Sequence, residues 1–312
     1  MILQLIIFTI SCGILITSGI FLVRSLSKIA RLLGISEFSA SFIIMAFATS
    51  IPELFVGVTS AIAGKAALSL GNVIGANIID LTLITGMIIL TTKEINFKTQ
   101  RIGHETDFML TTILFLIILY VIGDSISRID GIILLGLFSI HTYKTMKKRK
   151  KYPKKMKKLR GKSKGFIWLG IFLLALLGLF FSSHFVVESA SELAIQLDFP
   201  QMMIGLFLLS IATTLPELVF GLSASKLKHK EMAIGDQIGT VVANTTLVVG
   251  LVAIIQPITV EPLSFLTSAL FMFIAAFIFV TFLKTGGKLE RIEGMSLILI
   301  YVLFIIIEFF LR

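Results

Sequence analysis

Ten apolar stretches, each about 15 to 24 residues long, follow one another along the 312-residue chain. A helix needs roughly 20 mostly apolar residues to cross the hydrocarbon core of a bilayer. Because 56% of the residues are hydrophobic and only 15% are charged, the chain is too apolar for a water-soluble domain. The pattern predicts an all-α polytopic membrane protein of about ten transmembrane helices. The expected spans are Ile2–Val23, Phe42–Ile62, Leu68–Leu90, Phe108–Ile122, Ile126–Tyr143, Phe166–Val187, Met202–Leu222, Met232–Ile255, Leu263–Leu283 and Met295–Leu311.

Lys and Arg are distributed unevenly between the two sets of loops that alternating spans create. One set holds 25 of the 28 basic residues, and only Lys65, Arg128 and Arg312 fall in the other set. Cytoplasmic loops of membrane proteins carry the excess of Lys and Arg. We therefore expect a multi-pass protein of the plasma membrane whose basic loop 144–165 is cytoplasmic and whose two termini are outside.

The basic run 147–164 carries most of the net charge of +10. Clusters of this kind can bind anionic lipid head groups. A solvated loop that only fixes the topology is the interpretation that we favour. Nucleic-acid binding is not expected, because no nucleic-acid-binding fold accompanies the run, and nothing in the sequence indicates a protein partner.

The chain repeats itself at an offset of 164 residues. Without a gap, this offset aligns the segment 48–57, Ala-Thr-Ser-Ile-Pro-Glu-Leu-Phe-Val-Gly, with 212–221, Ala-Thr-Thr-Leu-Pro-Glu-Leu-Val-Phe-Gly. The copies are five spans apart, an odd number, so the second copy must be inverted in the membrane relative to the first. Inverted repeats are typical of secondary transporters, whose substrate site lies near the midplane where the copies meet. We expect two inverted five-helix repeats, 1–143 and 166–312, joined by the loop 144–165.

Charged side chains are rare in the middle of these spans, and those present are acids. Glu53 and Glu217 occupy matching places in the two repeats, while Asp80 in the third span is matched by Asn244. A charge at membrane depth costs at least a few kcal/mol, which makes such residues candidates for function. The four spans that hold them contain no Lys or Arg, so a buried ion pair cannot neutralise the acids. A bound cation, or protons when the site is empty, should supply the missing positive charge.

Pro52 and Pro216 are the only prolines deep inside expected spans. Each lacks an N–H and clashes with the carbonyl four residues earlier, which predicts a broken helix with freed backbone oxygens. Such backbone is tolerated at membrane depth where it lines a polar cavity. Hard oxygen ligands suit Ca²⁺, which accepts about six to eight of them, and can accommodate Na⁺. The expected cation ligands near the prolines are the carbonyl oxygens of Ala48 and Ala212 and the hydroxyl oxygens of Thr49, Ser50, Thr213 and Thr214.

A second polar strip runs along the third and eighth spans. Residues four positions apart share a helix face, so Asp236, Thr240 and Asn244 form one strip on the eighth span. Asp80 is the last residue of the corresponding strip on the third span. Thr240 therefore joins the candidate ligands. Asp236 lies near the start of its span and is either a weak access site for cations or a solvated carboxylate at a helix terminus. Both interpretations are open from the sequence.

These residues resemble the calcium/cation antiporter superfamily, specifically its sodium/calcium exchangers. That family carries two alpha-repeats with a Gly-Thr-Ser-x-Pro-Glu motif and a Gly-Asn-x-x-Gly-Ser motif that ends in Asn or Asp. The resemblance covers both repeats and implies that Glu53 and Glu217 ligate Ca²⁺, while nearby hydroxyls and carbonyls form Na⁺ sites. Asp80 and Asn244 fall on the positions that take Asn or Asp in the family. It also implies that the long first and sixth spans slide across the core to alternate access.

Departures from the family pattern bear on the coupling ion. The motif glycine is replaced by Ala48 and Ala212, the serine of the second motif is Ala76 in the first repeat, and its asparagine is Asp236 in the second. Without a hydroxyl at Ala76, one Na⁺ ligand that the resemblance implies is lost, and the sodium stoichiometry is open. Proton-driven members usually carry a different glutamate motif, so the resemblance favours Na⁺ over H⁺ or K⁺.

The expected function is secondary active antiport of Ca²⁺ against Na⁺ by alternating access, with no cofactor and no enzymatic activity. A Ca²⁺/H⁺ or K⁺-dependent antiporter is the alternative. An intramembrane enzyme is remote, because a phosphatase would place Lys or Arg beside its acids and a protease would need two catalytic Asp residues. A passive channel usually arranges several subunits around a pore, whereas an inverted repeat within one chain favours exchange.

Overall fold

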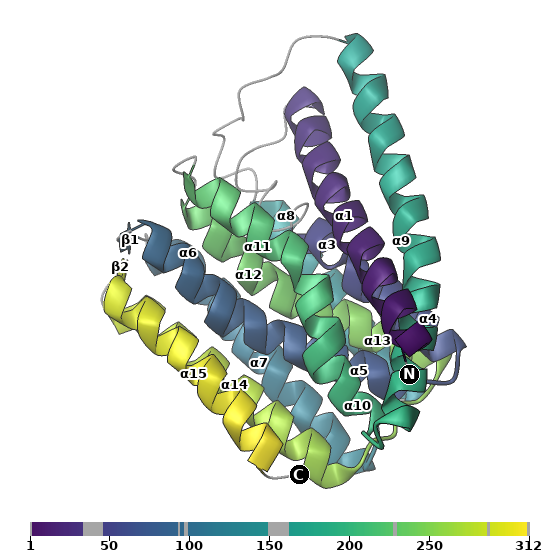
Figure 1. Cartoon of the computed structure of the whole chain (residues 1–312). Coiled ribbons are helices and arrows are strands. Elements are labelled where there is room, and N and C mark those ends of the chain that lie inside the picture. The colour runs from purple at the N-terminus through teal and green to yellow at the C-terminus, as the bar shows by residue number, and fades with distance from the viewer. Residues whose placement is uncertain are drawn as a thin grey trace.

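A computed structural model describes residues 2–33, 46–92, 94–96, 99–148, 162–226, 230–285 and 288–310 of the chain. Nearly all of these residues are helical (Figure 1). The first half comprises α1 (Ile2–Leu33), α3 (Ala46–Thr49), α4 (Ile51–Ile62), α5 (Ala66–Ile79), the π-helix η2 (Asp80–Ile84), α6 (Thr85–Thr92), β1 (Glu94–Asn96), α7 (Thr99–Gly123) and α8 (Arg128–Lys148). The second half comprises α9 (Lys162–Gln196), α10 (Gln201–Ile204), η4 (Gly205–Leu209), α11 (Ser210–Lys226), α12 (Lys230–Ala243), η5 (Asn244–Val248), α13 (Val249–Ile255), α14 (Pro262–Thr285), β2 (Lys288–Glu290) and α15 (Arg291–Phe310).

Eight helices in the described part of the chain are long and apolar enough to cross a membrane. They confirm a helical, multi-pass membrane protein, but they do not establish the expected count of ten. The expected span 42–62 is described only from Ala46 and contains the short apolar helix α4. The expected span 126–143 forms α8, which carries Arg128 and Asp130 at its start and lysines at its end. The count of ten stays a prediction.

The segment expected to be a basic loop is partly helical. Helix α8 continues to Lys148 and α9 begins at Lys162, so both helices extend into the range 144–165. Residues 149–161, the centre of the basic run, lie outside the described residues, and lipid binding there stays untested.

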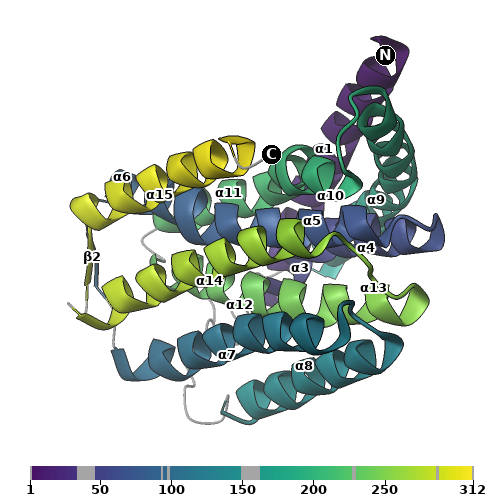
Figure 2. The same ribbon diagram turned by 90° about the horizontal axis from the view of Figure 1, so that it is seen from below.

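Helices α1 and α9 lie along each other and stand to one side of the remaining helices (Figures 1 and 2). Gln4 Nε2 donates a hydrogen bond to Glu192 Oε2 at 2.6 Å near one end of the pair, and the Lys28 ammonium lies 5.8 Å from the Trp168 ring centroid near the other. Within an apolar 18-residue stretch of α9, only 17% is buried in the protein. The corresponding share for the continuous segment α5–η2–α6 is 83%. The α5–η2–α6 segment therefore forms the centre of the protein, and α9 its periphery.

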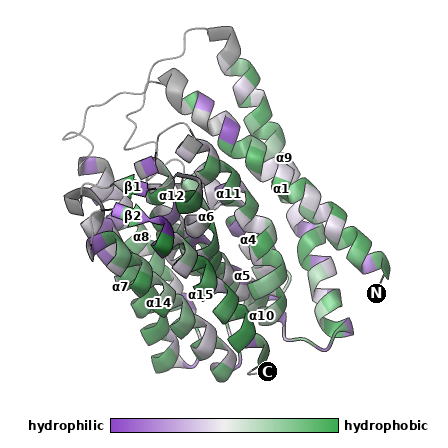
Figure 3. Ribbon diagram, turned by 60° about the vertical axis from the view of Figure 1, so that its left-hand side comes forward, coloured by the Kyte–Doolittle hydropathy of each residue, from purple (hydrophilic) through white to green (hydrophobic). Residues whose placement is uncertain are grey.

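The outer surfaces of the bundle are apolar, as a lipid-facing surface requires. Hydrophobic residues dominate α1, α7, α9, α14 and α15, whereas hydrophilic residues gather at the end that carries β1 and β2 (Figure 3). Side chains such as Leu174, Ile274 and Leu299 are at least half exposed. A soluble monomer rarely leaves so much contiguous apolar surface in water, and a bilayer removes that cost.

Two short pairings of backbone segments are related by the 164-residue offset of the internal repeat. In the antiparallel ribbon of β1 and β2, Glu94 pairs with Glu290. The equivalent positions in the other repeat, 164 residues away, are Ile258 and Ile126. These two residues form an isolated antiparallel bridge with backbone hydrogen bonds of 2.9 and 3.0 Å. The ribbon lies at one end of the bundle, and the α7–α8 and α13–α14 connections that carry the bridge lie at the other (Figure 2). Equivalent contacts at opposite ends are what an inverted repeat requires.

Glycines let the backbone of α5 touch the backbones of α10 and η4, which follow each other without a gap. A Cβ atom on Gly71 would lie 2.0 Å from the Met202 carbonyl oxygen, and one on Gly205 would lie 2.1 Å from the Leu68 carbonyl oxygen. Small residues permit this close approach of membrane helices. The contact joins the two repeats at their centre.

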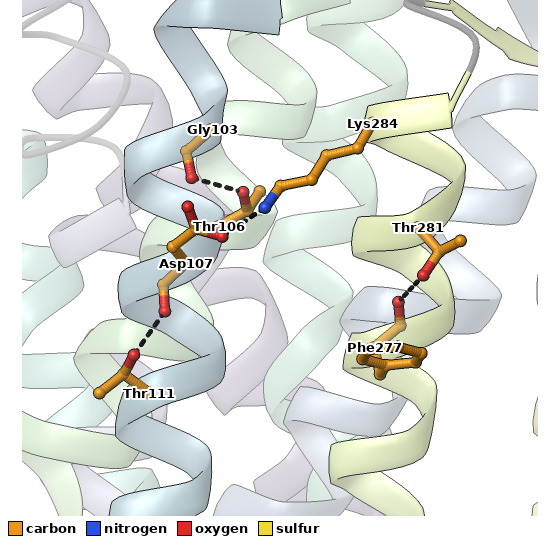
Figure 4. Close-up of polar contacts among 7 residues, drawn as sticks. All are labelled: Gly103, Thr106, Asp107, Thr111, Phe277, Thr281 and Lys284. Atoms are coloured by element: carbon orange, nitrogen blue, oxygen red, sulfur yellow. Dashed lines mark hydrogen bonds and ion pairs between the residues drawn. The ribbon is translucent and has the colours of Figure 1, made fainter.

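Polar side chains on α7 and α14 bond within their own helices and once between them (Figure 4). Thr111 Oγ1 donates to the Asp107 carbonyl at 2.7 Å, and Thr281 Oγ1 donates to the Phe277 carbonyl at 2.8 Å. Lys284 forms an ion pair with the Asp107 carboxylate. Because both partners of this pair are about half exposed, it contributes little to stability.

Candidate ion-binding site

Among the described residues, four fully buried carboxylates lie near one another in the helix bundle. Glu53, Asp80, Glu217 and Asp236 all have 0% exposure, and Glu217 lies close enough to the other three for their charges to act on it. Both oxygens of Glu53, Asp80 and Glu217 lack a hydrogen-bond partner among the described residues, as does Oδ2 of Asp236. A buried, uncompensated carboxylate is strongly unfavourable. The interior therefore suits cations.

The first repeat breaks its helix next to Glu53, as predicted. Helix α3 ends at Thr49, Ser50 lies outside both helices, and α4 begins at Ile51 with Pro52 in its first turn. Pro52 has no N–H to donate to the carbonyl of Ala48. Glu53 lies in the first turn of α4, where the helix dipole favours a negative charge.

The second repeat does not break at its proline, so that part of the prediction is wrong. Pro216 lies inside the continuous helix α11. The irregular turn lies earlier in the chain, in the π-helix η4. The hydroxyls of Thr213 and Thr214 donate to the Ser210 carbonyl at 3.4 and 2.8 Å, which stabilises the turn before the proline. Pro216 still lacks the N–H that the carbonyl of Ala212 would otherwise accept.

Equivalent π-helices begin at the next pair of candidate ligands. Asp80 is the first residue of η2 and Asn244 is the first residue of η5. A π-turn shifts the helix register and is frequent at functional sites. The hydroxyl of Thr85, the first residue of α6, donates to the Asp80 carbonyl at 2.7 Å. The register shift in both repeats thus falls on residues that the sequence singled out.

Hydroxyl contacts cross between the repeats in a symmetric way. Thr49 Oγ1 lies 3.0 Å from Thr240 Oγ1 and 3.5 Å from Asp236 Oδ1. In the equivalent contact, Thr213 Oγ1 donates to Asn72 Oδ1 at 3.1 Å. Each proline-containing segment therefore contacts the polar strip of the opposite repeat. All the residues predicted to bind ions are buried in this region of the structure.

Asp236 is not a solvated carboxylate at a helix terminus. Its side chain has 0% exposure, and it lies six residues after the start of α12. Helix α3 packs against α12 and covers it. The interpretation as a solvated helix-terminal residue is therefore wrong, and Asp236 adds a fourth buried charge to the site.

Buried amides complete the polar interior. Asn72, Asn77 and Gln237 have 0% exposure, and none was selected as a ligand from the sequence. The available signal was an uncharged amide within an apolar span. No three His, Cys, Asp or Glu side chains among the described residues converge on a single metal position. Hydroxyl, amide and carbonyl oxygens lie between the acids and can complete a cation's coordination shell.

A model of the sodium/calcium exchanger protein family matches residues 3–146 and 167–310. The two matches start and end 164 residues apart, the same offset as the internal repeat.

Curated relatives cover most of the chain. The sodium/calcium exchanger MaX1 of Methanosarcina acetivorans is 26% identical over 95% of this chain and 96% of its own length. The uncharacterized membrane protein MJ0091 of Methanocaldococcus jannaschii is 30% identical over 70% of each chain.

Solved structures share the architecture. The sodium-calcium exchanger NCX_Mj, soaked with 2.5 mM Na⁺ and 0.1 mM Ca²⁺, superimposes with a TM-score of 0.68 at 25% identity over 98% of both chains. The H⁺/Ca²⁺ exchanger CAX superimposes with a TM-score of 0.80 over 97% of this chain and 82% of that one, but at 18% identity it shows the fold alone. With both repeats matched by the family model, this chain belongs to the sodium/calcium exchanger family.

Proposed function

We propose that this protein exchanges Ca²⁺ for Na⁺ across the plasma membrane by alternating access. The observation that carries the proposal is the group of four buried carboxylates, most of whose oxygens have no hydrogen-bond partner. Family membership supports calcium/cation antiport, which is transport and not enzymatic chemistry. The names of MaX1 and NCX_Mj support Na⁺ as the coupling ion.

The coupling mechanism follows from charge. Ca²⁺ or several Na⁺ ions bind in turn between the repeats and compensate the carboxylates. With its acids ionised and no cation bound, the site is too unfavourable in the occluded state for the protein to change the side on which the site is open. Each ion therefore permits the transition that the empty site prevents, which is a shift of populations by differential binding.

The position of α1 supports a role for the long helices in this transition. A Cβ atom on Gly19 would lie 2.6 Å from Cγ of Pro216 and 3.2 Å from Cγ of Pro52. Helix α1 thus crosses the proline segments of both repeats at one point. Movement of α1 along this contact would change access to both halves of the site.

Radioactive Ca²⁺ uptake into proteoliposomes tests the proposal. Vesicles loaded with Na⁺ and diluted into Na⁺-free buffer should accumulate Ca²⁺, and vesicles loaded with K⁺ or choline should not. Uptake that follows only an imposed pH gradient would assign the protein to proton coupling. No uptake under any gradient would contradict calcium transport.

Cysteine labelling tests the proposed orientation. The native Cys12 is the only cysteine and is buried, so a Cys12→Ser background provides a clean reference. Lys288, in β2, and Arg128, the first residue of α8, are both exposed. The strand β2 and the α7–α8 connection lie at opposite ends of the bundle (Figure 2). On intact cells, a membrane-impermeant maleimide should label Arg128→Cys and not Lys288→Cys until the cells are permeabilised. The reverse pattern would place the basic loops outside.

Asp236→Asn should weaken cation binding. Asp236 lies eight residues before Asn244, about 12 Å along the helix. At that distance and an effective dielectric constant of about 20, one charge contributes about 1.4 kcal/mol per unit of cation charge, or roughly tenfold in affinity. Because Ca²⁺ carries two charges, the Ca²⁺ concentration for half-maximal uptake should rise by roughly tenfold to 100-fold.

The equivalent residue of the first repeat supplies the control for this prediction. Asn72→Asp combined with Asp236→Asn keeps the number of acids and moves one to the mirror-image position. This double variant should recover affinity on one side of the membrane only. Parent-like affinity of Asp236→Asn from both sides would remove Asp236 from the site.

A further inference from the structure

Asn244 and Asp80 occupy equivalent positions but present their oxygens differently. A carboxylate offers an acceptor oxygen in either orientation, whereas an amide offers either its oxygen or its NH₂ group. Asn244 can ligate a cation only if its amide is held with the oxygen toward the ion. The structure contains a set of contacts that does this.

A chain of buried hydrogen bonds ends on the Asn244 amide. Thr245 Oγ1 donates to the carbonyl of Val241. The same hydroxyl oxygen accepts from Asn77 Nδ2 at 3.3 Å, and Asn77 Oδ1 accepts from Asn244 Nδ2 at 3.2 Å. Asn77, Asn244 and Thr245 all have 0% exposure, so water does not compete for these groups.

The far end of this chain fixes its direction. A backbone carbonyl only accepts, so Thr245 must donate to Val241 and accept from Asn77. The Met272 sulfur, 3.4 Å from Asn77 Nδ2, is likewise only an acceptor. Both contacts require the NH₂ group of Asn77 on their side, which leaves its oxygen toward Asn244. The Asn244 NH₂ group is thereby engaged, and its Oδ1 is buried with no hydrogen-bond partner in the part of the chain that the structure describes.

Asp80 has no corresponding chain. The offset of 164 places Val241 opposite Asn77 and Leu81 opposite Thr245. Neither oxygen of Asp80 has a hydrogen-bond partner among the described residues. Asn77 and Thr245 are thus polar on the side of the site where the ligand is the Asn244 amide. Their equivalents are apolar on the side of Asp80, a carboxylate that needs no orientation.

We propose that Asn77 is a positioning residue of the ion site, which holds the Asn244 amide with its oxygen free to bind the transported cation. This inference rests on the proposed function, because it treats Asn244 as a ligand. Helix α5 of the first repeat thereby sets the orientation of a ligand in η5 of the second. Without Asn77 the amide can turn and present its NH₂ group to a cation, which repels it.

A double-mutant cycle tests this role. Asn77→Val introduces the residue found at the equivalent position of the other repeat and should raise the half-maximal Ca²⁺ concentration about tenfold, as loss of a partner that orients a metal ligand does. In an Asn244→Asp background, the same substitution should change it by less than about twofold, because a carboxylate needs no orientation. Ca²⁺ binding to the purified, detergent-solubilised protein, measured by calorimetry, should show the same pattern.

Neighbouring hydroxyls provide a matched control that keeps Asn77 in place. Thr245→Val removes the far end of the chain and should lower Ca²⁺ affinity severalfold. Thr246→Val removes an equally buried hydroxyl that donates to the Val242 carbonyl, and should leave affinity within about twofold. This pair decides the question if Asn77→Val does not fold.

The outcomes separate the two proposals. A tenfold loss in the parent background that disappears with Asn244→Asp supports positioning. Equal losses in both backgrounds, or equal effects of Thr245→Val and Thr246→Val, would overturn it in favour of general packing. A parent that binds and transports no Ca²⁺ would instead overturn the proposed function.

Discussion

Glu53→Gln and Glu217→Gln are each expected to abolish Na⁺-driven Ca²⁺ uptake. Glutamine keeps the size of the side chain and removes one negative charge, and the four expected spans that hold the acids contain no Lys or Arg to compensate for it. The Ca²⁺ concentration for half-maximal uptake should rise by at least about 100-fold, the upper end of the effect seen for residues that merely support a metal ligand. Initial rates of uptake over a wide range of Ca²⁺ concentrations measure this change.

Two controls accompany this measurement. Glu308 is also a buried glutamate, but it lies in α15, where it accepts a hydrogen bond from Ser268 at 2.8 Å. Glu308→Gln should retain uptake, which separates loss of a ligand from loss of any buried charge. Glu53→Asp keeps the charge with a shorter side chain and should give a partial loss. Parent-like uptake by either glutamine variant at the proposed site would contradict the assignment of that residue.

Gly71→Ala is expected to destabilise the whole protein. The three atoms nearest to the added Cβ would be the Met202 carbonyl oxygen at 2.0 Å, its carbon at 2.8 Å and the Leu206 nitrogen at 3.0 Å. All three belong to the backbone, so no side chain can rotate to make room. Helix α5 must move away from α10 and η4, and overpacking of this kind costs about 1–3 kcal/mol or more. Thermal unfolding in detergent, monitored by size-exclusion chromatography, measures this loss of stability.

Gly136→Ala is the matched control, because no atom lies within 4 Å of its added Cβ. This glycine lies inside α8. There alanine should leave stability unchanged or raise it by up to about 1 kcal/mol through helix propensity. Equal unfolding temperatures for the two variants would contradict the close contact between α5 and η4. Helix α5 leads directly into η2, whose first residue is Asp80, so Gly71→Ala should also reduce uptake by protein that remains folded.

Local features of the sequence predicted much of the candidate site. Glu53, Glu217 and Asp80 stand out because a charge in an apolar span is unfavourable wherever the chain folds. The break at Ser50 follows from the missing N–H of Pro52, a covalent property. The repeat and its inversion follow from alignment and from the odd number of intervening spans. These predictions needed no knowledge of which helices touch.

The features that the sequence predicted wrongly, left open or missed share a different cause. Pro216 has the same chemistry as Pro52, yet α11 continues through it, with the irregular turn in η4 and threonine hydroxyls bonded to the turn before it. Asp236 was open between two interpretations because its exposure depends on α3, which precedes it by nearly 190 residues and packs over α12. The ribbon of β1 and β2 joins two three-residue segments far apart in the chain, with no strand pattern in either.

The sequence by itself determined the membrane environment, the internal repeat and the presence of acids within apolar spans, because hydrophobicity, charge and proline chemistry are properties of single residues and short segments. The tertiary structure alone decided that Asp236 is buried, that Thr49 meets Thr240, and that Asn77 holds the amide of Asn244. The physical reason is that each of these features is a contact between the two repeats. Such contacts depend on how the helices of opposite repeats pack, and that packing is set by the whole fold.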